Sequence, residues 1–417
     1  MPIYNSFSRI FEGLVLAVAT AVVLVACGGG GGGSASPPGV PEVMYFPATS
    51  DTTTGYQLWK TDGTASGTVA VKTINTGGNA FPRDFTTFNG ATYFVATDGT
   101  DFQLWKTDGT ASGTVAVTSI SNLNPQDITV HNGTLYFGGH DDTNGWQLWK
   151  SDGTASGTAA VTTVAEGFSS SFSPTGFTVF NGELYFSAHD DTNGTQLWKS
   201  DGTAAHTQVV TDAASGFGNN SSPQDLVVFN NNLYFAAYDI SNVWWQLWKS
   251  DGTASGTAAV TTGSNLSPMD LVTFNGALYF KGYDATNGSQ LWISDGTASG
   301  TAAVTTVAGG FNTSLNPRGL IVFNGALYFT AIDVANGFQL WKSNGTAAGT
   351  SAVTTAAGGF NNKFSPSGYT VLNGALYFPA NEPAYGLELW KSDGTEGNTQ
   401  ILMDICPGPC DGWPGPM

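Results

Sequence analysis

The feature that most restricts the fold of this chain is a motif that occurs eight times. Its marker is the pair Leu-Trp, and successive markers are 46, 44, 49, 50, 44, 49 and 49 residues apart. The marker tryptophans are Trp59, Trp105, Trp149, Trp198, Trp248, Trp292, Trp341 and Trp390. Lys follows all of them except one, where Ile293 stands, and Asp-Gly-Thr comes next, with Asn344 as the one replacement for Asp. Since periods of about 20 to 50 residues indicate repeat architectures, we expect a repeat domain from residue 43 to residue 405.

Each repeat divides into four short segments, as residues 177–210 illustrate. The first segment, "FTVF", ends at Asn181-Gly182, a strong signal for a two-residue hairpin because both turn positions need positive φ. The segments "ELYFSA", "TQLWKS" and "TQVV" follow, each bounded by turn residues. β-Branched and aromatic residues dominate the first three segments. The repeat therefore predicts a four-stranded antiparallel meander.

The second segment contains Leu-Tyr-Phe, which is apolar on consecutive residues and therefore on both faces of a strand. Such a sheet needs a neighbour on each side. Stacking the repeats in a ring covers every face, which is the β-propeller solution. We predict an all-β chain folded as a β-propeller of about eight four-stranded antiparallel blades, with an open β solenoid as the alternative.

The number of segments leaves one strand missing. The first repeat begins at "VMYF" (Val43 to Phe46), which is a second segment, so 31 strands are visible where eight full blades need 32. Either the first blade has three strands, or Pro38 to Glu42 supplies a poor fourth, or the ring stays open. We favour eight blades closed by packing of the last repeat on the first.

The repeat resembles a known bacterial family, the ELWxxDGT repeat proteins, in "LWKSDGTASGT" (Leu148 to Thr158) followed by "NG" and "LYF". The resemblance covers about nine tenths of the chain. It implies a propeller-like fold and an extracytoplasmic, often surface-attached setting, without an established activity. This chain departs from the family where Gln replaces the first Glu in most repeats, and the Glu returns only at Glu388.

The first 42 residues predict export and a membrane anchor. Residues 1–26 carry Arg9 and an apolar run from Leu14 to Ala26, too short for a bilayer span and typical of a signal peptide. Leu24-Val25-Ala26-Cys27 resembles the lipobox of bacterial lipoproteins, which predicts lipidation at Cys27; a leader or uncleaved anchor with an incidental Cys is the alternative. Residues 27–42, rich in Gly, Ser and Pro, then form a tether. We expect an outer-membrane lipoprotein, on the periplasmic or the cell-surface side.

The composition limits the partners of the chain. Its 31 acidic and 13 basic residues give a formal charge of −18, which repels the phosphates of nucleic acids. We therefore expect contact with a membrane through the lipid anchor and a glycan or protein ligand, but no nucleic acid.

Export also allows Cys406 and Cys410, in the tail at residues 406–417, to form a disulfide, although two free thiols are nearly as compatible with the sequence.

The connection from the fourth segment to the next first segment is the variable part of each repeat. From each Trp to the next turn Asn the count ranges from 27 to 32, whereas from that Asn to the next Trp it is 16 to 18. Variable loops on a rigid scaffold often carry binding sites. These connections end in Pro-x-Asp or Pro-x-Gly, which would ring a channel mouth if the first segment is innermost. Arg83 and Arg318 are then candidate contacts for a carboxylate, unless each pairs with a nearby Asp.

The turns after the second segment lie on the same face and carry "HDDTNG" twice. His140 and His189, with Asp141 and Asp190, are the candidate metal ligands, because adjacent repeats would bring them together. Asp, Asn and Gly are also what any turn prefers, and the Ca²⁺ loop with its closing Glu is missing.

Three further tryptophans, Trp146, Trp244 and Trp245, are not part of the repeat and are candidate binding residues, or else cover blade edges. We identify no catalytic residues and expect no cofactor, since none of the common catalytic motifs is found. The favoured function is a binding or adhesion module; the alternatives are a propeller enzyme acting on polysaccharide and a passive envelope protein.

Overall fold

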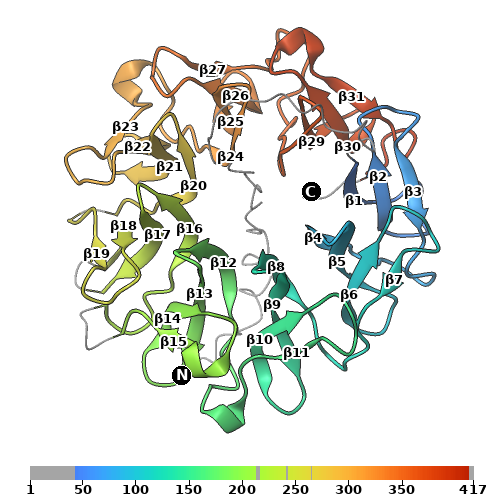
Figure 1. The fold of residues 1–417 in the computed structure, drawn as a ribbon. Coiled ribbons are helices and arrows are strands. Elements are labelled where there is room, and N and C mark those ends of the chain that lie inside the picture. The colour runs from blue at the N-terminus through green and yellow to red at the C-terminus, as the bar shows by residue number, and fades with distance from the viewer. Residues whose placement is uncertain (1–42, 213–216, 241–242, 264, 413–417) are drawn as a thin grey trace, which may run out of the picture.

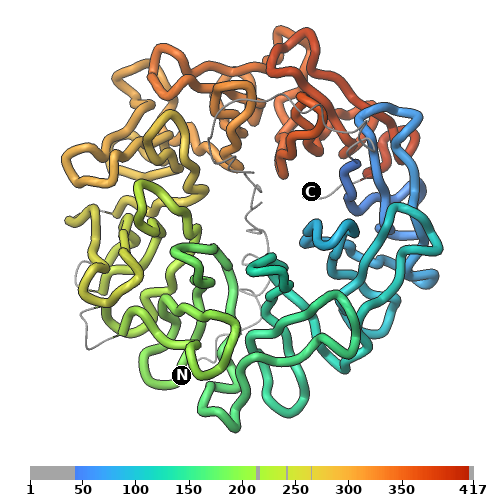
Figure 2. The backbone as a smooth tube through the Cα atoms, viewed as in Figure 1, coloured from blue at the N-terminus to red at the C-terminus, as the bar shows by residue number. Residues whose placement is uncertain are grey.

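The computed structural model describes residues 43–212, 217–240, 243–263 and 265–412. These residues form eight antiparallel sheets arranged as blades around one axis (Figure 1). The first and last blades lie side by side, as the tube in Figure 2 shows, and the blue and red ends of the repeat region meet there. The structure confirms the β-propeller and excludes the open solenoid.

The strands of each blade follow one another in the chain. Blade 1 contains β1 (Met44–Ala48), β2 (Gln57–Thr61) and β3 (Val69–Lys72), and blade 2 contains β4 (Arg83–Phe88), β5 (Ala91–Thr97), β6 (Phe102–Thr107) and β7 (Val115–Ala116). Blade 3 contains β8 (Gln126–His131), β9 (Thr134–Asp141), β10 (Gly145–Ser151) and β11 (Ala159–Ala160), and blade 4 contains β12 (Thr175–Phe180), β13 (Glu183–Asp190), β14 (Gly194–Ser200) and β15 (Gln208–Val209). Blade 5 contains β16 (Gln224–Phe229), β17 (Asn232–Asp239), β18 (Trp244–Ser250) and β19 (Ala258–Ala259), and blade 6 contains β20 (Met269–Phe274), β21 (Ala277–Asp284), β22 (Gly288–Ser294) and β23 (Ala302–Ala303). Blade 7 contains β24 (Arg318–Phe323), β25 (Ala326–Asp333), β26 (Gly337–Ser343) and β27 (Thr350–Ala352), and blade 8 contains β28 (Thr370–Leu372), β29 (Ala375–Glu382), β30 (Gly386–Ser392) and β31 (Gln400–Met403). Short 3₁₀ helices are η1 (Val164–Glu166), η2 (Ala204–His206), η4 (Val307–Gly309) and η5 (Glu396–Asn398).

The first strand of each complete blade is innermost, as expected from its aliphatic sequence (Figure 1). Inner strands of neighbouring blades lie against one another, for example β8 against β12 and β12 against β16. The hairpin after each inner strand has the predicted geometry. Asn181 and Gly182, for instance, have φ of 50° and 79°, and both values match the positive φ that a two-residue hairpin of this kind requires.

The core consists of layers between blades rather than one central cluster. The layer between blades 3 and 4 packs Tyr136 and Leu148 of blade 3 against Leu184, Phe186 and Trp198 of blade 4. Tyr185, the residue between Leu184 and Phe186, belongs to the next layer. Consecutive residues of Leu-Tyr-Phe therefore cover opposite faces of the sheet, which is why a blade needs two neighbours.

The Asp-Gly-Thr signature lies at the same interface between blades. At the Gly of this signature φ is close to 90°, and a Cβ atom there would collide with the Tyr hydroxyl of the preceding blade, as for Gly252 and Tyr185. The Asp closes its own turn, because Asp152 Oδ1 accepts hydrogen bonds from Thr154 N at 2.9 Å and Thr154 Oγ1 at 2.7 Å. In some blades the signature Lys reaches the next blade, as Lys60 Nζ does by donating to Gly109 O at 2.9 Å, whereas Lys199 Nζ pairs with Glu183 of its own blade at 3.0 Å. The signature is therefore part of the scaffold.

Blade 1 has three strands among the described residues, and the ring nevertheless closes. One buried cluster unites Met44, Phe46 and Trp59 of blade 1 with Leu372 and Tyr377 of blade 8. The Tyr377 hydroxyl lies at Gly63, as a Tyr hydroxyl lies at the signature Gly of every other interface. Lys391 Nζ donates to Gly63 O at 3.1 Å, as Lys60 Nζ does to Gly109 O. The prediction that the last repeat packs on the first is confirmed; the alternative fourth strand at Pro38 to Glu42 lies outside the described residues.

The segment after β31 completes this closure. In each other interface the connection between blades offers a carbonyl to the next blade, as Leu123 O does to His140 N at 2.7 Å. Gly412 O accepts from Thr49 N of blade 1 at 3.1 Å in the same way. Residues 405–412 therefore act as the connection from blade 8 to blade 1 and belong to the ring, although the sequence suggested a separate tail from Cys406.

The two ends of the ring differ. We call the end with the connections between blades and the turns after each second strand the loop face, and the end with the Asn-Gly and Asp-Gly-Thr turns the turn face. Met44 pairs with Thr61, the residue before the Asp-Gly-Thr turn, so β1 begins at the turn face. Residues 1–42, which include the expected signal peptide, Cys27 and the tether, lie outside the described part of the chain. Among the described residues, none belongs to a helix long and apolar enough to span a membrane.

Candidate functional site

The loop face carries the residues that the sequence singled out. The turn between the second and third strands and the connection that follows the fourth strand meet there, because Trp146 N donates to Ser170 O at 2.9 Å. The third strand then begins with a buried Gln that holds both segments. Gln147 Nε2 donates to Asn144 O at 2.8 Å and Ser169 O at 2.9 Å, while Gln147 Oε1 accepts from Thr162 Oγ1 at 2.8 Å. This Gln is therefore a buried clamp under the loop face.

One aromatic position recurs directly before this Gln. In five of eight blades an aromatic side chain occupies it, and all five are partly exposed: Tyr56, Phe102, Trp146, Trp245 and Phe338. A side chain at the start of the third strand faces the end of the second strand, so Trp146 lies beside His140 with ring centroids 5.7 Å apart. Trp245 lies beside Tyr238 at 6.2 Å in the same way. Two of the predicted tryptophans therefore occupy one repeat position in different blades.

Further apolar side chains are exposed around these rings. Trp244, directly before Trp245, is 44% exposed, and Phe81 of the connection between blades 1 and 2 is 45% exposed. Phe81 lies between Tyr56 and Phe102, with centroid distances of 6.2 and 6.4 Å. The exposed large apolar residues of the turns on this face also include Ile240, Val243, Val334 and Tyr385. These side chains add apolar surface to the loop face.

Arg83 is held by its own surroundings. Its guanidinium carbon lies 4.4 Å from the Phe102 centroid, and its Nη2 donates to Asn124 Oδ1 at 3.1 Å. Arg83 Nε also lies 3.8 Å from Asp84 Oδ2. The alternative interpretation, in which this arginine pairs with a nearby Asp, is therefore the one that the structure shows for Arg83. Arg318 stacks on Phe338, 5.3 Å from the ring centroid, but has Gly319 where Arg83 has Asp84.

Four carboxylates link neighbouring inner strands at this face. Asp84, Asp127, Asp225 and Asp270 stand second in their inner strands with φ between 55° and 57°, a conformation that favours Asp and Gly in the predicted Pro-x-Asp/Gly pattern. Asp127 Oδ2 accepts from Gly176 N of the next blade at 3.0 Å, and Asp225 Oδ2 accepts from Asp270 N at 2.8 Å. Burial raises the pKa of Asp84 and of Asp225 to about 6 in each case. These carboxylates connect the blades, in addition to carrying charge near the axis.

The four candidate metal ligands lie in adjacent blades and make local contacts. Asp141 Oδ1 accepts from Thr143 N at 2.8 Å and Asn144 N at 2.7 Å, which is a turn closed on itself. Asp190 repeats this geometry, with hydrogen bonds from Thr192 N at 2.8 Å and Asn193 N at 2.7 Å. His140 lies at Trp146, and His189 Nε2 is 3.9 Å from Asp191 Oδ1. In the part of the chain described, no group of three or more His, Cys, Asp or Glu side chains is placed to hold a metal.

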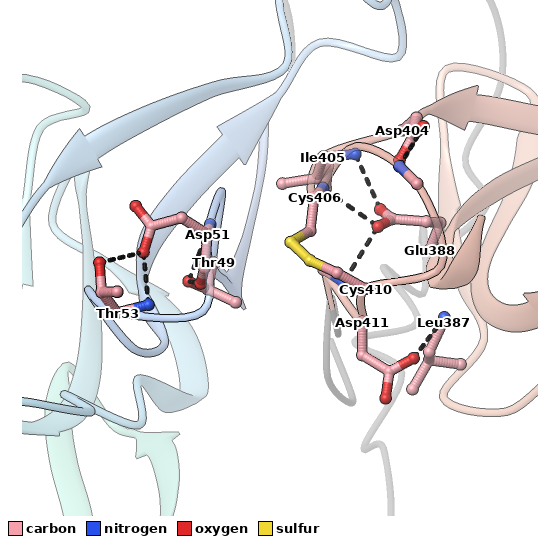
Figure 3. The surroundings of a disulfide bond; sticks show 12 residues. Thr49, Asp51, Thr53, Leu387, Glu388, Asp404, Ile405, Cys406, Cys410 and Asp411 are labelled. Carbon is pink, nitrogen blue, oxygen red and sulfur yellow. Dashed lines mark hydrogen bonds between the residues drawn. A yellow bond between two sulfur atoms is a disulfide. The ribbon is translucent and has the colours of Figure 1, made fainter.

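The closing connection beside the loop face contains a feature that the sequence only partly indicated. Cys406 and Cys410 form the disulfide that was one of two predicted possibilities (Figure 3). Glu388 points into this connection and accepts hydrogen bonds from Ile405 N at 2.9 Å, Cys406 N at 3.1 Å and Gly412 N at 3.0 Å. Burial raises the pKa of Glu388 to about 7, partly offset by the three amide donors. The one Glu at the clamp position therefore serves ring closure.

Two hollows, of 540 and 590 Å³, lie beside the third and fourth strands of blades 3 and 7 and are open to solvent. Trp149 and Asp141 line the first, and Trp341 and Asp333 line the second. Neither of these two hollows is lined by His or Arg. The predicted binding residues share a face, distributed over blades 2, 3, 5 and 7, and none of them lines either of these two hollows.

Comparisons with known proteins support the fold alone. No protein-family profile matches the chain, and no curated protein matches it by sequence. Among solved structures, a prolyl endopeptidase matches with a TM-score of 0.54 at 9% identity, over 77% of this chain and 49% of that chain. A puromycin hydrolase variant matches with a TM-score of 0.52 at 12% identity (77% and 53%), and a puromycin-hydrolysing peptidase of Mycobacterium tuberculosis with 0.51 at 8% (78% and 53%). This chain spans about half the length of these peptidases.

Proposed function

We propose that this protein is a lipid-anchored binding or adhesion module of the bacterial cell envelope, whose loop face binds a glycan or a protein surface. The observation that carries the proposal is the aromatic position before the clamp Gln, which is occupied and partly exposed in five of eight blades. Aromatic rings give a large contact area with few rotatable bonds, and they are enriched where proteins bind partners. A set of separate aromatic contacts suits an extended ligand better than a small one enclosed in a pocket.

The setting at the envelope is supported by the first 42 residues and by the resemblance to the ELWxxDGT repeat proteins, which are extracytoplasmic and often attached to a surface. The lipobox-like Leu24-Val25-Ala26-Cys27 gives the position of the acyl chains. The outer membrane is the proposed location. A disulfide at Cys406–Cys410 is compatible with such an oxidising compartment.

The anchor can be tested directly at Cys27. We expect Cys27→Ala to abolish incorporation of labelled palmitate and to release the protein from membranes, because buried acyl chains supply the membrane affinity. The measurement is metabolic labelling followed by detergent phase partitioning of the full chain. Cys410→Ser is the matched control, since it alters a cysteine in the folded ring and should leave labelling unchanged. Palmitate incorporation into Cys27→Ala, or unchanged partitioning, would refute the lipid anchor.

The binding role can be tested with a glycan array probed by the full chain in mild detergent. We expect binding to a restricted set of glycans and about a tenfold loss of affinity for Trp244→Ala, about 1.4 kcal/mol, because Trp is the residue most often found at binding hot spots. Val371→Ala, on the innermost strand β28 of blade 8, is the control. Absence of any glycan binding, combined with a protein captured through the loop face, would favour the protein ligand. Equal affinity of Trp244→Ala and Val371→Ala for the glycan would show that the exposed aromatic residues of the loop face do not bind it.

A further inference from the structure

Lys281 is the one charged residue at its repeat position. The residue directly after Leu-Tyr-Phe, or its counterpart in the first two repeats, is uncharged in the other seven blades: Pro47, Val95, Gly138, Ser187, Ala236, Thr330 and Pro379. Lys281 stands on β21 and is half-buried. Burial lowers the pKa of this ammonium group and the positive charge of Arg318 lowers it further, while the negative charge of Asp270 opposes both effects. A half-buried basic group at a position that is otherwise uncharged suggests a role for its charge, in a chain whose formal charge is −18.

Strand register brings Lys281 close to Arg318. Lys281 is the partner of Met269 on β20, and the residue after Met269 is Asp270. Asp270 Oδ2 accepts a hydrogen bond from Gly319 N of blade 7 at 2.8 Å, and Gly319 directly follows Arg318. The two cations therefore lie on either side of Asp270 at the loop face, one from each blade. Both also act on Asp270, where their positive charges oppose the rise in its pKa that burial causes.

This pair differs from the other arginine of the face. Arg83 uses its donors on Asn124 and approaches Asp84, as described above. Within the described ranges, neither the Lys281 ammonium nor the Arg318 guanidinium makes a hydrogen bond or an ion pair within 4.0 Å. Arg318 is exposed, and stacking on Phe338 orients its plane while leaving its N–H groups available. Two cations with available donors at one edge form a site for an anion.

The neighbouring residues indicate what carries the anion. Tyr283 stands two residues after Lys281 on β21, hence on the same side of the strand, and is 39% exposed. Phe338 lies under Arg318. The site thus combines two cations with aromatic faces, which matches a charged group attached to a ring with an apolar face. The charge of the whole chain repels a densely charged polymer, and Asp270 reduces the local positive charge, so a single carboxylate is favoured over a polyanion.

We propose that Lys281 and Arg318 bind the carboxylate of an acidic sugar, such as a uronic acid residue in an otherwise neutral glycan. The inference rests on the proposed glycan-binding function of the loop face. Arg318 supplies the planar pair of donors that fits a carboxylate, and Lys281 supplies a point charge from the adjacent blade. Tyr283 and Phe338 cover the sugar ring.

The test compares a neutral oligosaccharide with the same oligosaccharide ending in glucuronic acid, titrated calorimetrically into the full chain. We expect the acidic form to bind at least tenfold more tightly. The variants Lys281→Ala and Arg318→Gln introduce residues that other blades carry at these positions, Ala236 and Gln224, so the fold is preserved. Each should reduce the preference for the acid over the neutral sugar to below threefold. Lys363→Met, at an exposed lysine elsewhere on the loop face, is the control and should keep the preference.

The outcomes separate this inference from the proposed function. Equal affinity for acidic and neutral sugars, or an acid preference that survives both variants, would overturn the carboxylate site while leaving glycan binding intact. Binding of an acidic peptide with the same dependence on Lys281 and Arg318 would show that the carboxylate belongs to a protein instead and would overturn the sugar assignment. Failure of every sugar tested to bind would overturn the acidic-sugar site and the glycan form of the proposed function, and would leave the protein ligand.

Discussion

Replacing Trp198 by Ala is expected to lower the free energy of unfolding by about 3 to 5 kcal/mol, as for other buried aromatic truncations. Trp198 is 8% exposed and meets Phe172 edge to face with centroids 4.9 Å apart. It lies in the layer that joins blades 3 and 4. Its loss leaves a cavity that the surrounding strands, fixed by their register, fill poorly. Urea denaturation of the full chain, followed by far-ultraviolet circular dichroism, measures the change.

Trp244→Ala is the matched control, since it removes the same side chain from a position 44% exposed on the loop face. We expect a change in unfolding free energy of less than about 0.5 kcal/mol, as for most surface substitutions. Similar losses for the two variants would mean that Trp244 is buried in solution, and a negligible loss for Trp198→Ala would mean that the layers between blades do not hold the ring together.

The second large effect is expected at the seam between blades 8 and 1. Tyr377, 1% exposed, contacts Gly63 across the seam as Tyr185, 2% exposed, contacts Gly252 at an ordinary interface. If the seam packs like the other interfaces, Tyr377→Ala and Tyr185→Ala should each cost about 3 to 5 kcal/mol, because both remove a buried aromatic ring from the same setting. Parallel urea denaturation of the two variants gives the comparison.

The difference between the two tyrosine variants is the informative quantity. A cost below about 1 kcal/mol for Tyr377→Ala, with the full cost for Tyr185→Ala, would show that the seam opens readily and that blade 1 is held more weakly than the rest. Equal losses of unfolding free energy would show that the three strands of blade 1 and the closing connection hold the seam as firmly as an ordinary interface. This comparison needs no assumption about the ligand.

Much of the fold could be predicted because the same strand and turn patterns occur eight times in the sequence. The Asn-Gly turns and the spacing of Leu-Trp specify turns and strands, and the consecutive apolar residues of Leu-Tyr-Phe make a strand apolar on both faces, which requires a neighbour on each side. The missing strand of blade 1 was visible from "VMYF". The sequence favoured a closed ring, but only the structure establishes it. Gly412 contacts blade 1 because residues 405–412 extend that far, and no sequence pattern predicts this extension.

The site was predicted less completely, because side-chain partners depend on contacts between blades. Trp146, Trp244 and Trp245 lie on the predicted face, but nothing in the sequence shows that Arg83 is held by Asn124 of the next blade. Lys281 was missed, although it had a signal: it is the one charge at a position that is otherwise uncharged. Departures from a repeat identify such residues better than the repeat itself, which describes the scaffold.

The direction in which the chain enters the ring bears on how the proposed lipid anchor would hold the protein at a bilayer. β1 begins at the turn face, so a tether running from Cys27 to Val43 would reach the propeller from that side. A molecule anchored through this tether would have its turn face toward the lipid and its loop face toward the surrounding medium. Changing the length of the glycine run would then alter the distance of the loop face from the membrane, without altering the ligand that it binds.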